Sequence, residues 1–220
     1  MDHKITALKA QKRNPDRVSV YLDGEYAIGV TRIVAAWLQV GQSLSDEKIA
    51  TLQAAEAREV AFLKALKLLS YRPRSQAELE RKLREDEVAE PVIETVIERL
   101  RAGGMVNDGV FAHNWVESRV TFHPRGRRVL AMELRQKGIS DEIIEQALAE
   151  TGDENELARQ AAEKYARRLQ GQDWETFYKR LTGFLIRRGF NYGTAAPIVH
   201  DLWDKQGGQS ELKSSDYEEV

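Results

Sequence analysis

A repeat with a period of 51 residues constrains the fold of this 220-residue chain more than any other feature of its sequence. Leu83, Leu134 and Leu185 occupy equivalent positions in three copies, each inside a short stretch of helical character. Another amphipathic helix is expected before each leucine, over residues 57–69, 108–120 and 155–169. The three copies therefore predict the same local order of elements.

A third helix is expected behind each leucine, marked by two apolar pairs one turn apart. The pairs fall over residues 92–97 in the first copy and 143–148 in the second, at the same offset of 51 residues. In the third copy the pattern over residues 198–203 comes about four residues late, so Phe190–Gly193 is predicted to be an insertion. A three-helix unit of this size cannot close a core alone, and stacking of neighbouring units is the expected outcome.

Before the repeat, the sequence predicts a small three-stranded meander. The strands are expected over residues 5–8, 18–22 and 26–30. Asn14-Pro15-Asp16 is a turn signal, and Asp23-Gly24 is typical of a two-residue hairpin turn that needs positive φ at both positions. A meander of this size buries little surface, so we expect it to pack on the helices that follow.

Helix boundaries can be assigned from capping residues. An apolar run over 31–40 predicts a short helix. Ser45 can cap a helix that continues to about Ser70, with room for a break near residues 54–56. Ser75-Gln-Ala-Glu78 has the pattern of a capping box, in which the serine oxygen and the glutamate each bind a backbone amide at the start of a helix.

The chain is thus predicted to be mainly α-helical, with three tandem three-helix units of helix-turn-helix-like form behind the meander. The expected boundaries are 1–44 for the meander and a short helix, 45–107, 108–154 and 155–206 for the three units, and 207–220 for an acidic tail. The tail is rich in Gly, Ser and acidic residues, so we expect it to be disordered.

Composition excludes several classes of function. No cysteine is present, so disulfides and thiolate metal sites are excluded. No signal peptide or membrane-length apolar run is evident, and we expect a cytoplasmic protein. The four histidines lack metal-ligand spacing, and no phosphate loop or nucleophile motif occurs. We therefore expect no catalytic residues, no cofactor and no bound metal, and hence not an enzyme.

Basic residues are the most prominent candidates for a binding function. The formal net charge is −2, so nucleic-acid binding would have to come from local charge asymmetry. Between Asn114 and Lys137 there are six basic residues and two acidic ones, mostly at the junction of the first and second helices of the second unit. Guanidinium groups near a helix N-terminus favour an anion, either a phosphate or a partner's carboxylate. The competing interpretation is a solvated helix face with ion pairs to Glu117 and Glu133.

Three ordered stretches, Leu68–Leu83, Asn107–Arg119 and Glu133–Ile139, resemble the RecX family of regulators. The resemblance implies a curved, elongated rod of three three-helix units that binds along the groove of the RecA nucleoprotein filament. It further implies lower ATP hydrolysis, strand exchange and co-protease activity by RecA. Residues 84–89 depart from the family pattern, because Glu85-Asp86-Glu87 stands where a basic residue and glycine are common. That departure interrupts the basic face expected through the first unit.

The residues that match the family pattern and the basic clusters together define the predicted contact site. The predicted RecA or DNA contacts are Arg72, Arg74, Arg119, Arg125, Arg127, Arg128, Arg135 and Lys137. The arginines at the equivalent turns of the first two units are expected to be exposed and to form one interrupted positive strip. We expect the protein to act as a monomer, with the RecA filament as partner and with single- or double-stranded DNA as an alternative ligand.

The runner-up function is direct DNA binding through helix-turn-helix units without RecA. The third helices of the first two units carry outward-facing acids that would repel phosphate, which disfavours sequence-specific recognition. These acids are Glu94, Glu98, Glu142 and Glu145.

Overall fold

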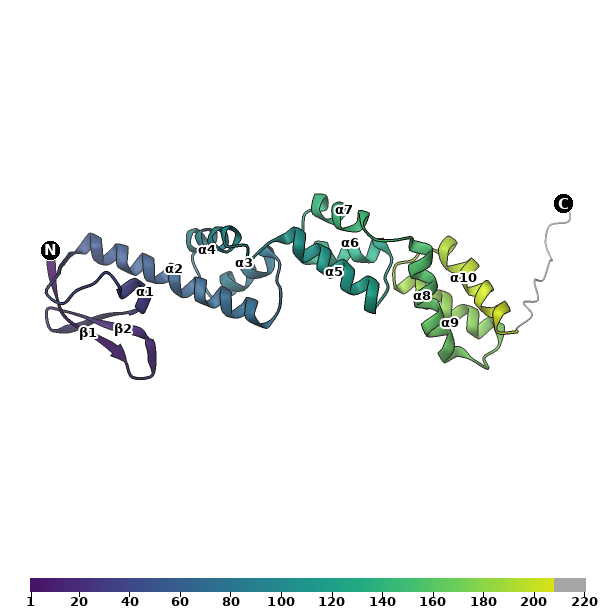
Figure 1. The fold of residues 1–220 in the computed structure, drawn as a ribbon, viewed down its shortest axis with the longest axis horizontal. Helices are drawn as coiled ribbons and strands as arrows, with labels where there is room; N and C mark the ends of the chain where they lie inside the picture. Colours follow the sequence, from purple (N-terminus) through teal and green to yellow (C-terminus); the bar gives the residue numbers. More distant parts are fainter. Residues whose placement is uncertain (208–220) are drawn as a thin grey trace. The chain divides into compact units, whose positions relative to one another are not determined.

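The computed structural model describes residues 1–207, and most of the predicted acidic tail lies outside the described residues. The chain divides into two compact units, Met1–Asn107 and Asp108–Val220, which are described in turn. Figure 1 shows a small sheet at the N-terminal end, followed by helices only. None of the helices in the described part is long and apolar enough to cross a membrane.

The first unit opens with a four-stranded antiparallel sheet. Its strands are β1 (Asp2–Gln11), β2 (Asn14–Leu22), β3 (Glu25–Thr31) and β4 (Ser43–Ser45), in the order β3-β2-β1-β4. The predicted meander is confirmed, and Asp23 and Gly24 both have positive φ, as the hairpin turn requires. The fourth strand was not predicted, because three residues are too short to show an alternating pattern.

Two helices follow the meander, and both differ from the expectation. The run over 31–40 forms only a single turn, α1 (Arg32–Ala35), and Trp37 beyond it is 84% exposed. By contrast, α2 (Asp46–Tyr71) runs without the break considered near residues 54–56. Glu56 is buried in this part of α2. It accepts a 2.6 Å hydrogen bond from the Thr31 amide and forms an ion pair with Arg17 at 2.9 Å. A charged residue inside the helix therefore anchors the sheet to α2.

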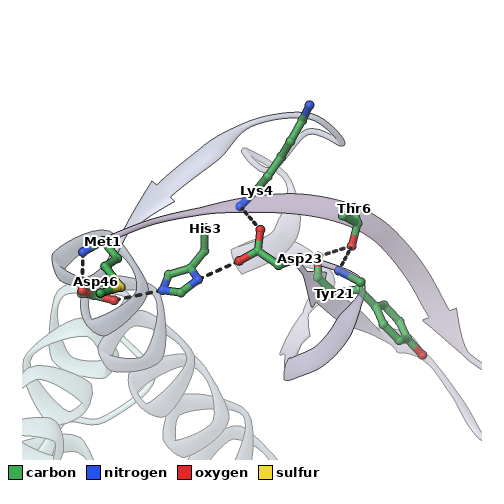
Figure 2. Close-up of polar contacts among 8 residues, drawn as sticks. Met1, His3, Lys4, Thr6, Tyr21, Asp23 and Asp46 are labelled. Atoms are coloured by element: carbon green, nitrogen blue, oxygen red, sulfur yellow. Dashed lines mark hydrogen bonds and ion pairs between the residues drawn. The ribbon is translucent and has the colours of Figure 1, made fainter.

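His3 makes a second connection between the sheet and α2 (Figure 2). Its Nδ1 lies 2.8 Å from a carboxylate oxygen of Asp23 in the hairpin turn, and its Nε2 lies 3.2 Å from Asp46 at the start of α2. The other Asp23 oxygen accepts the Lys4 amide at 2.9 Å. The hydrogen bond to Asp23, with a further one to Asp46, raises the pKa of His3 above its ordinary value.

The first three-helix unit consists of α2, α3 (Gln76–Glu85) and α4 (Glu90–Ala102). The predicted capping box at the start of α3 is present, with Ser75 and Glu78 each bound to the other's backbone amide. The core is built from Ala65 of α2, Leu79 and Leu83 of α3, and Ile93 of α4.

The second compact unit contains the other two repeats. Its helices are α5 (Asp108–Phe122), α6 (Arg127–Gln136), α7 (Asp141–Ala149), α8 (Glu154–Ala166), α9 (Trp174–Arg187) and α10 (Tyr192–Lys205), with a 3₁₀ turn η1 (Arg167–Leu169) after α8. Leu83, Leu134 and Leu185 are all fully buried, each in the core of its own unit. The expectation that such a unit cannot close a core alone is therefore wrong, because each repeat has a separate buried cluster. The three-helix repeat read from these leucines is therefore confirmed.

The predicted insertion at Phe190–Gly193 is wrong. The third helices α4, α7 and α10 begin at positions 90, 141 and 192, so the period of 51 residues holds throughout. Ala195 occupies the buried position of Ile93 and Ile144, and a small side chain there hid the first apolar pair of the third copy. The pair at 198–199 corresponds to the second pair of the other copies, and a further apolar turn follows on the same helix face.

Candidate basic contact site

A buried carboxylate organises the basic cluster of the second repeat. Glu133 on α6 is 9% exposed and accepts a 2.8 Å hydrogen bond from Trp115 Nε1 on α5. The same oxygen accepts Arg119 Nε at 2.9 Å, and the other oxygen pairs with Arg125 from the turn between the helices. Two helices and their connecting turn therefore meet on one acid.

Aromatic and cationic side chains stack beside this acid. The Trp115 ring packs on Phe111, with ring centroids 6.0 Å apart. The Arg119 guanidinium lies 4.4 Å from the Trp115 ring centroid, and Lys137 Nζ lies 4.9 Å from it. The indole face is attractive to both cations because its π electrons are negative. This set holds three of the predicted contact residues together: Arg119, Arg125 and Lys137.

The remaining predicted residues of this repeat are exposed. Arg127 sits at the first turn of α6, where its Nε donates to the Thr151 hydroxyl at 3.0 Å and its own amide donates to Glu154. Arg128 is exposed and forms no ion pair among the described residues. Arg135 is exposed and pairs with Asp141 at 2.7 Å. A surface pair of this kind contributes little to stability, so Arg135 can exchange partners at small cost.

In the first compact unit, Arg72 and Arg74 are held by the turn that precedes α3. Arg72 makes two hydrogen bonds to the carboxylate of Glu78, at 3.0 and 3.1 Å, and Glu78 raises the pKa of Arg72. Arg74 is half-buried and donates from Nε to the Leu68 carbonyl at 3.1 Å. Glu78, the buried glutamate of the capping box, thus fixes the position of Arg72, whose side chain is still 45% exposed.

The expectation that these arginines are all exposed needs correction. Arg127 and Arg128 are exposed, whereas Arg125 and Arg74 are half-buried and bonded within their own units. The competing interpretation was a solvated helix face with ion pairs to Glu117 and Glu133. Arg119 and Arg125 do pair with Glu133, but Glu133 is buried, so this part of the cluster is not a solvated face. The sequence could not predict that Arg119 and Arg125 lie on a buried acid beside an aromatic stack. A glutamate inside a helix is usually a surface residue, and nothing in the spacing around Glu133 indicates that it is buried.

The junction between the second and third repeats brings two glycines into contact. The Gly126 amide donates to the Arg188 carbonyl at 2.9 Å, and a Cβ added to Gly126 would lie 2.4 Å from the Gly189 carbonyl oxygen. Gly189 itself has a φ of +92°, which favours glycine. Arg188 donates to the Pro124 carbonyl at 3.0 Å. The turn that carries Arg125, together with the start of α6 that carries Arg127 and Arg128, is therefore fixed against the third repeat.

No group of three or more His, Cys, Asp or Glu side chains that could hold a metal ion occurs within residues 1–207. The acids considered as obstacles to phosphate binding on the third helices are exposed, as expected: Glu94, Glu98, Glu142 and Glu145.

Models of one protein family match four successive segments of the chain. The model of the regulatory protein RecX N-terminal domain matches residues 3–45. The models of the first, second and third RecX three-helix domains match residues 61–100, 107–148 and 153–197.

Individual relatives agree with the domain matches. The chain is 32% identical to regulatory protein RecX of Bacillus pumilus over 94% of this chain and 80% of that protein. It is 38% identical to regulatory protein RecX of Streptomyces coelicolor over 66% of this chain and 79% of that protein. A crystal structure of regulatory protein RecX superposes with a TM-score of 0.72 at 28% identity, covering 90% of this chain and 99% of that one. The chain belongs to the RecX family.

Proposed function

We propose that this protein binds the RecA nucleoprotein filament and lowers its ATP hydrolysis, strand exchange and co-protease activity. Membership of a family whose relatives are named as regulatory proteins carries the proposal. Such a regulator would act in the cytoplasm, where the recombinase works, and would need no active site of its own.

The physical basis is many weak contacts on one chain. Three three-helix units in tandem can engage several protomers of a repeating filament, and linked contacts add through their effective concentration. Exposed cations such as Arg128 and Arg135 supply long-range attraction to an acidic protein surface or to DNA phosphates. Charges at the rim of an interface mainly change the association rate.

Direct sequence-specific DNA binding by the helix-turn-helix-like units is less well supported. A recognition helix must offer cations and hydrogen-bond donors to the major groove. The third helices α4 and α7 instead expose Glu94, Glu98, Glu142 and Glu145. These carboxylates would repel the phosphates on either side of the groove.

The test is inhibition of DNA-dependent ATP hydrolysis by RecA, titrated with wild type and with the double variant Arg128→Glu/Arg135→Glu. Arg125 is left intact, because its reversal would place a second carboxylate against Glu133. Two reversed rim charges, each worth about 0.5–1 kcal/mol, should raise the half-inhibiting concentration roughly 5- to 30-fold. The difference should shrink as salt is added.

The matched control is Lys12→Glu/Arg13→Glu, which makes the same charge change at exposed positions of the β1–β2 turn. This control should inhibit nearly as well as wild type. Equal inhibition by both double variants and wild type would mean that the basic residues of α6 are only a solvated face. No inhibition by wild type would overturn the proposed function itself.

A further inference from the structure

A pocket with no assigned role lies between the second and third repeats, inside the Asp108–Val220 unit. Its volume is about 270 Å³, slightly below the range of pockets that hold drug-sized ligands and sufficient for a group the size of one nucleobase. It is lined by the end of α5, the turn after it, α8, η1 and α9. No acidic side chain lines it among the residues that the structure describes.

Three cationic side chains line this pocket without a counterion among the described residues. They are Lys164 on α8, Arg168 in η1 and Arg188 after α9, and none forms an ion pair within the described part of the chain. Lys164 and Arg168 are exposed, whereas Arg188 is half-buried. Burial, together with the nearby charge of Arg125, lowers the pKa of Arg188 below its ordinary value. An anion in the pocket would relieve this repulsion between like charges.

The positive charge of these three side chains exceeds the partial negative charge of the helix C-termini beside the pocket. Basic residues are common at helix C-termini, because each terminus carries roughly half a negative charge. Phe122 ends α5 and Arg188 caps α9, and the last turns of α8 lead into η1. Three such termini would offset only about half of the positive charge of Lys164, Arg168 and Arg188.

Aromatic rings alternate with these cations. Tyr165 and Phe184 are stacked with centroids 4.1 Å apart, and the Arg188 guanidinium lies 4.4 Å from the Phe184 centroid. Phe122 also lines the pocket and is 64% exposed, which is unusual for a phenylalanine next to a packed junction. Proteins that bind single-stranded nucleic acid combine a basic groove that follows the backbone with aromatic faces on which bases stack.

We propose that this pocket binds single-stranded DNA, with a base stacked on Phe122 and the neighbouring phosphates held by Lys164 and Arg168. Arg188 supplies positive charge from the wall of the pocket, and its bond to the Pro124 carbonyl fixes the turn that follows Phe122 at the end of α5. Binding is independent of sequence, because stacking and phosphate contacts do not read base edges. The site goes beyond the proposed function, since it requires no recombinase.

The test uses the full chain and a fluorescein-labelled oligothymidylate of about 20 nucleotides, with binding measured by anisotropy over a range of salt concentrations. The matched pair is Arg168→Ala and Arg167→Ala, two exposed neighbours in η1 of which only Arg168 lines the pocket. Loss of one phosphate contact should reduce the slope of log K against log salt by about 0.7 for Arg168→Ala. The slope should be unchanged for Arg167→Ala.

Stacking is tested with an abasic strand of the same length. Phe122→Ala should weaken binding of the thymidylate roughly 5- to 150-fold and leave binding of the abasic strand unchanged. Trp37→Ala, which removes an exposed aromatic ring from the first unit, should affect neither strand. Thermal melts of all variants should coincide with wild type, because Phe122, Arg167 and Arg168 are exposed.

Three results would overturn the inference: no binding of the oligonucleotide by wild type, equal slopes for the two arginine variants, or the same penalty for Phe122→Ala on both strands. The outcome is separable from the proposed function. A wild-type protein that inhibits RecA but binds no free oligonucleotide contradicts only the pocket. One that binds the oligonucleotide through the pocket but leaves RecA unaffected contradicts only the proposed function.

Discussion

Replacing Glu133 by alanine tests whether this buried acid organises the second repeat. The substitution removes the acceptor of the Trp115 indole N–H and leaves Arg119 and Arg125 without their carboxylate. The three donors come from α5 and from the turn before α6, so the change affects the contact between those helices directly. We therefore expect Glu133→Ala to cause a large loss of stability, although a glutamate in a helix is ordinarily a surface residue.

The magnitude follows from the three contacts. A hydrogen bond to a charged group contributes roughly 1.5–3 kcal/mol, which applies to the 2.8 Å bond from Trp115. The side chains of Arg119 and Arg125 are 26% and 37% exposed, so solvent screens their ion pairs to about 0.5–1 kcal/mol each. Both arginines can reach water once released. We therefore expect Glu133→Ala to lower the free energy of unfolding by about 2.5–5 kcal/mol.

The assay is urea unfolding followed by tryptophan fluorescence, because three of the four tryptophans lie in the Asp108–Val220 unit. The control is Glu117→Ala, an exposed acid on α5, which should change the free energy of unfolding by less than about 0.5 kcal/mol. Equal unfolding midpoints for Glu133→Ala and Glu117→Ala would refute the reasoning, and the arginines would then have to be regarded as free surface charges.

Three further changes test other parts of the fold. Leu134→Ala should destabilise the second repeat by about 2–5 kcal/mol in a urea melt, because Leu134 is fully buried at the repeat position, and an unchanged melt would contradict the repeat. Gly126→Ala should cost about 1–3 kcal/mol, since its Cβ would meet the Gly189 carbonyl at 2.4 Å; a variant as stable as wild type would mean that the junction is loose. His3→Gln should destabilise the first unit at pH 6. The folded-state pKa of His3 is raised above 6.5, so its contribution is present below that pH and is lost as pH rises through the folded-state pKa. Melts from pH 5.5 to 9.5 should therefore converge with the wild type at high pH, and a constant difference across that range would contradict a protonated His3.

The features that could be predicted from the sequence are those set by local spacing. Leu83, Leu134 and Leu185 gave the repeat because large apolar side chains are seldom exposed at three equivalent positions. Ser75 and Glu78 gave a helix start because both partners of the capping box lie within one turn. In each case the interacting groups are close in sequence or recur at a fixed distance.

The features that could not be predicted depend on partners brought together by the fold. Glu56 looks like a helix surface residue until the Thr31 amide reaches it. Ala195 is too small to mark a core position, although it fills the place of two isoleucines. The pocket beside Phe122 collects side chains from two repeats, and Lys164 and Arg168 carry no motif that separates them from ordinary surface cations. Burial and ion pairing must be seen in three dimensions before such residues can be assigned roles.

The most direct test of the regulatory function is co-sedimentation of the wild-type chain with RecA. Three samples are compared: RecA assembled on single-stranded DNA, the same DNA alone, and RecA alone. Many contacts along a repeating filament should add through effective concentration. The chain is therefore expected to sediment with the filament at concentrations at which it stays in the supernatant when mixed with the DNA alone or with RecA alone. Sedimentation with the DNA alone to the same extent, or none with the filament, would contradict filament binding as the function of this protein.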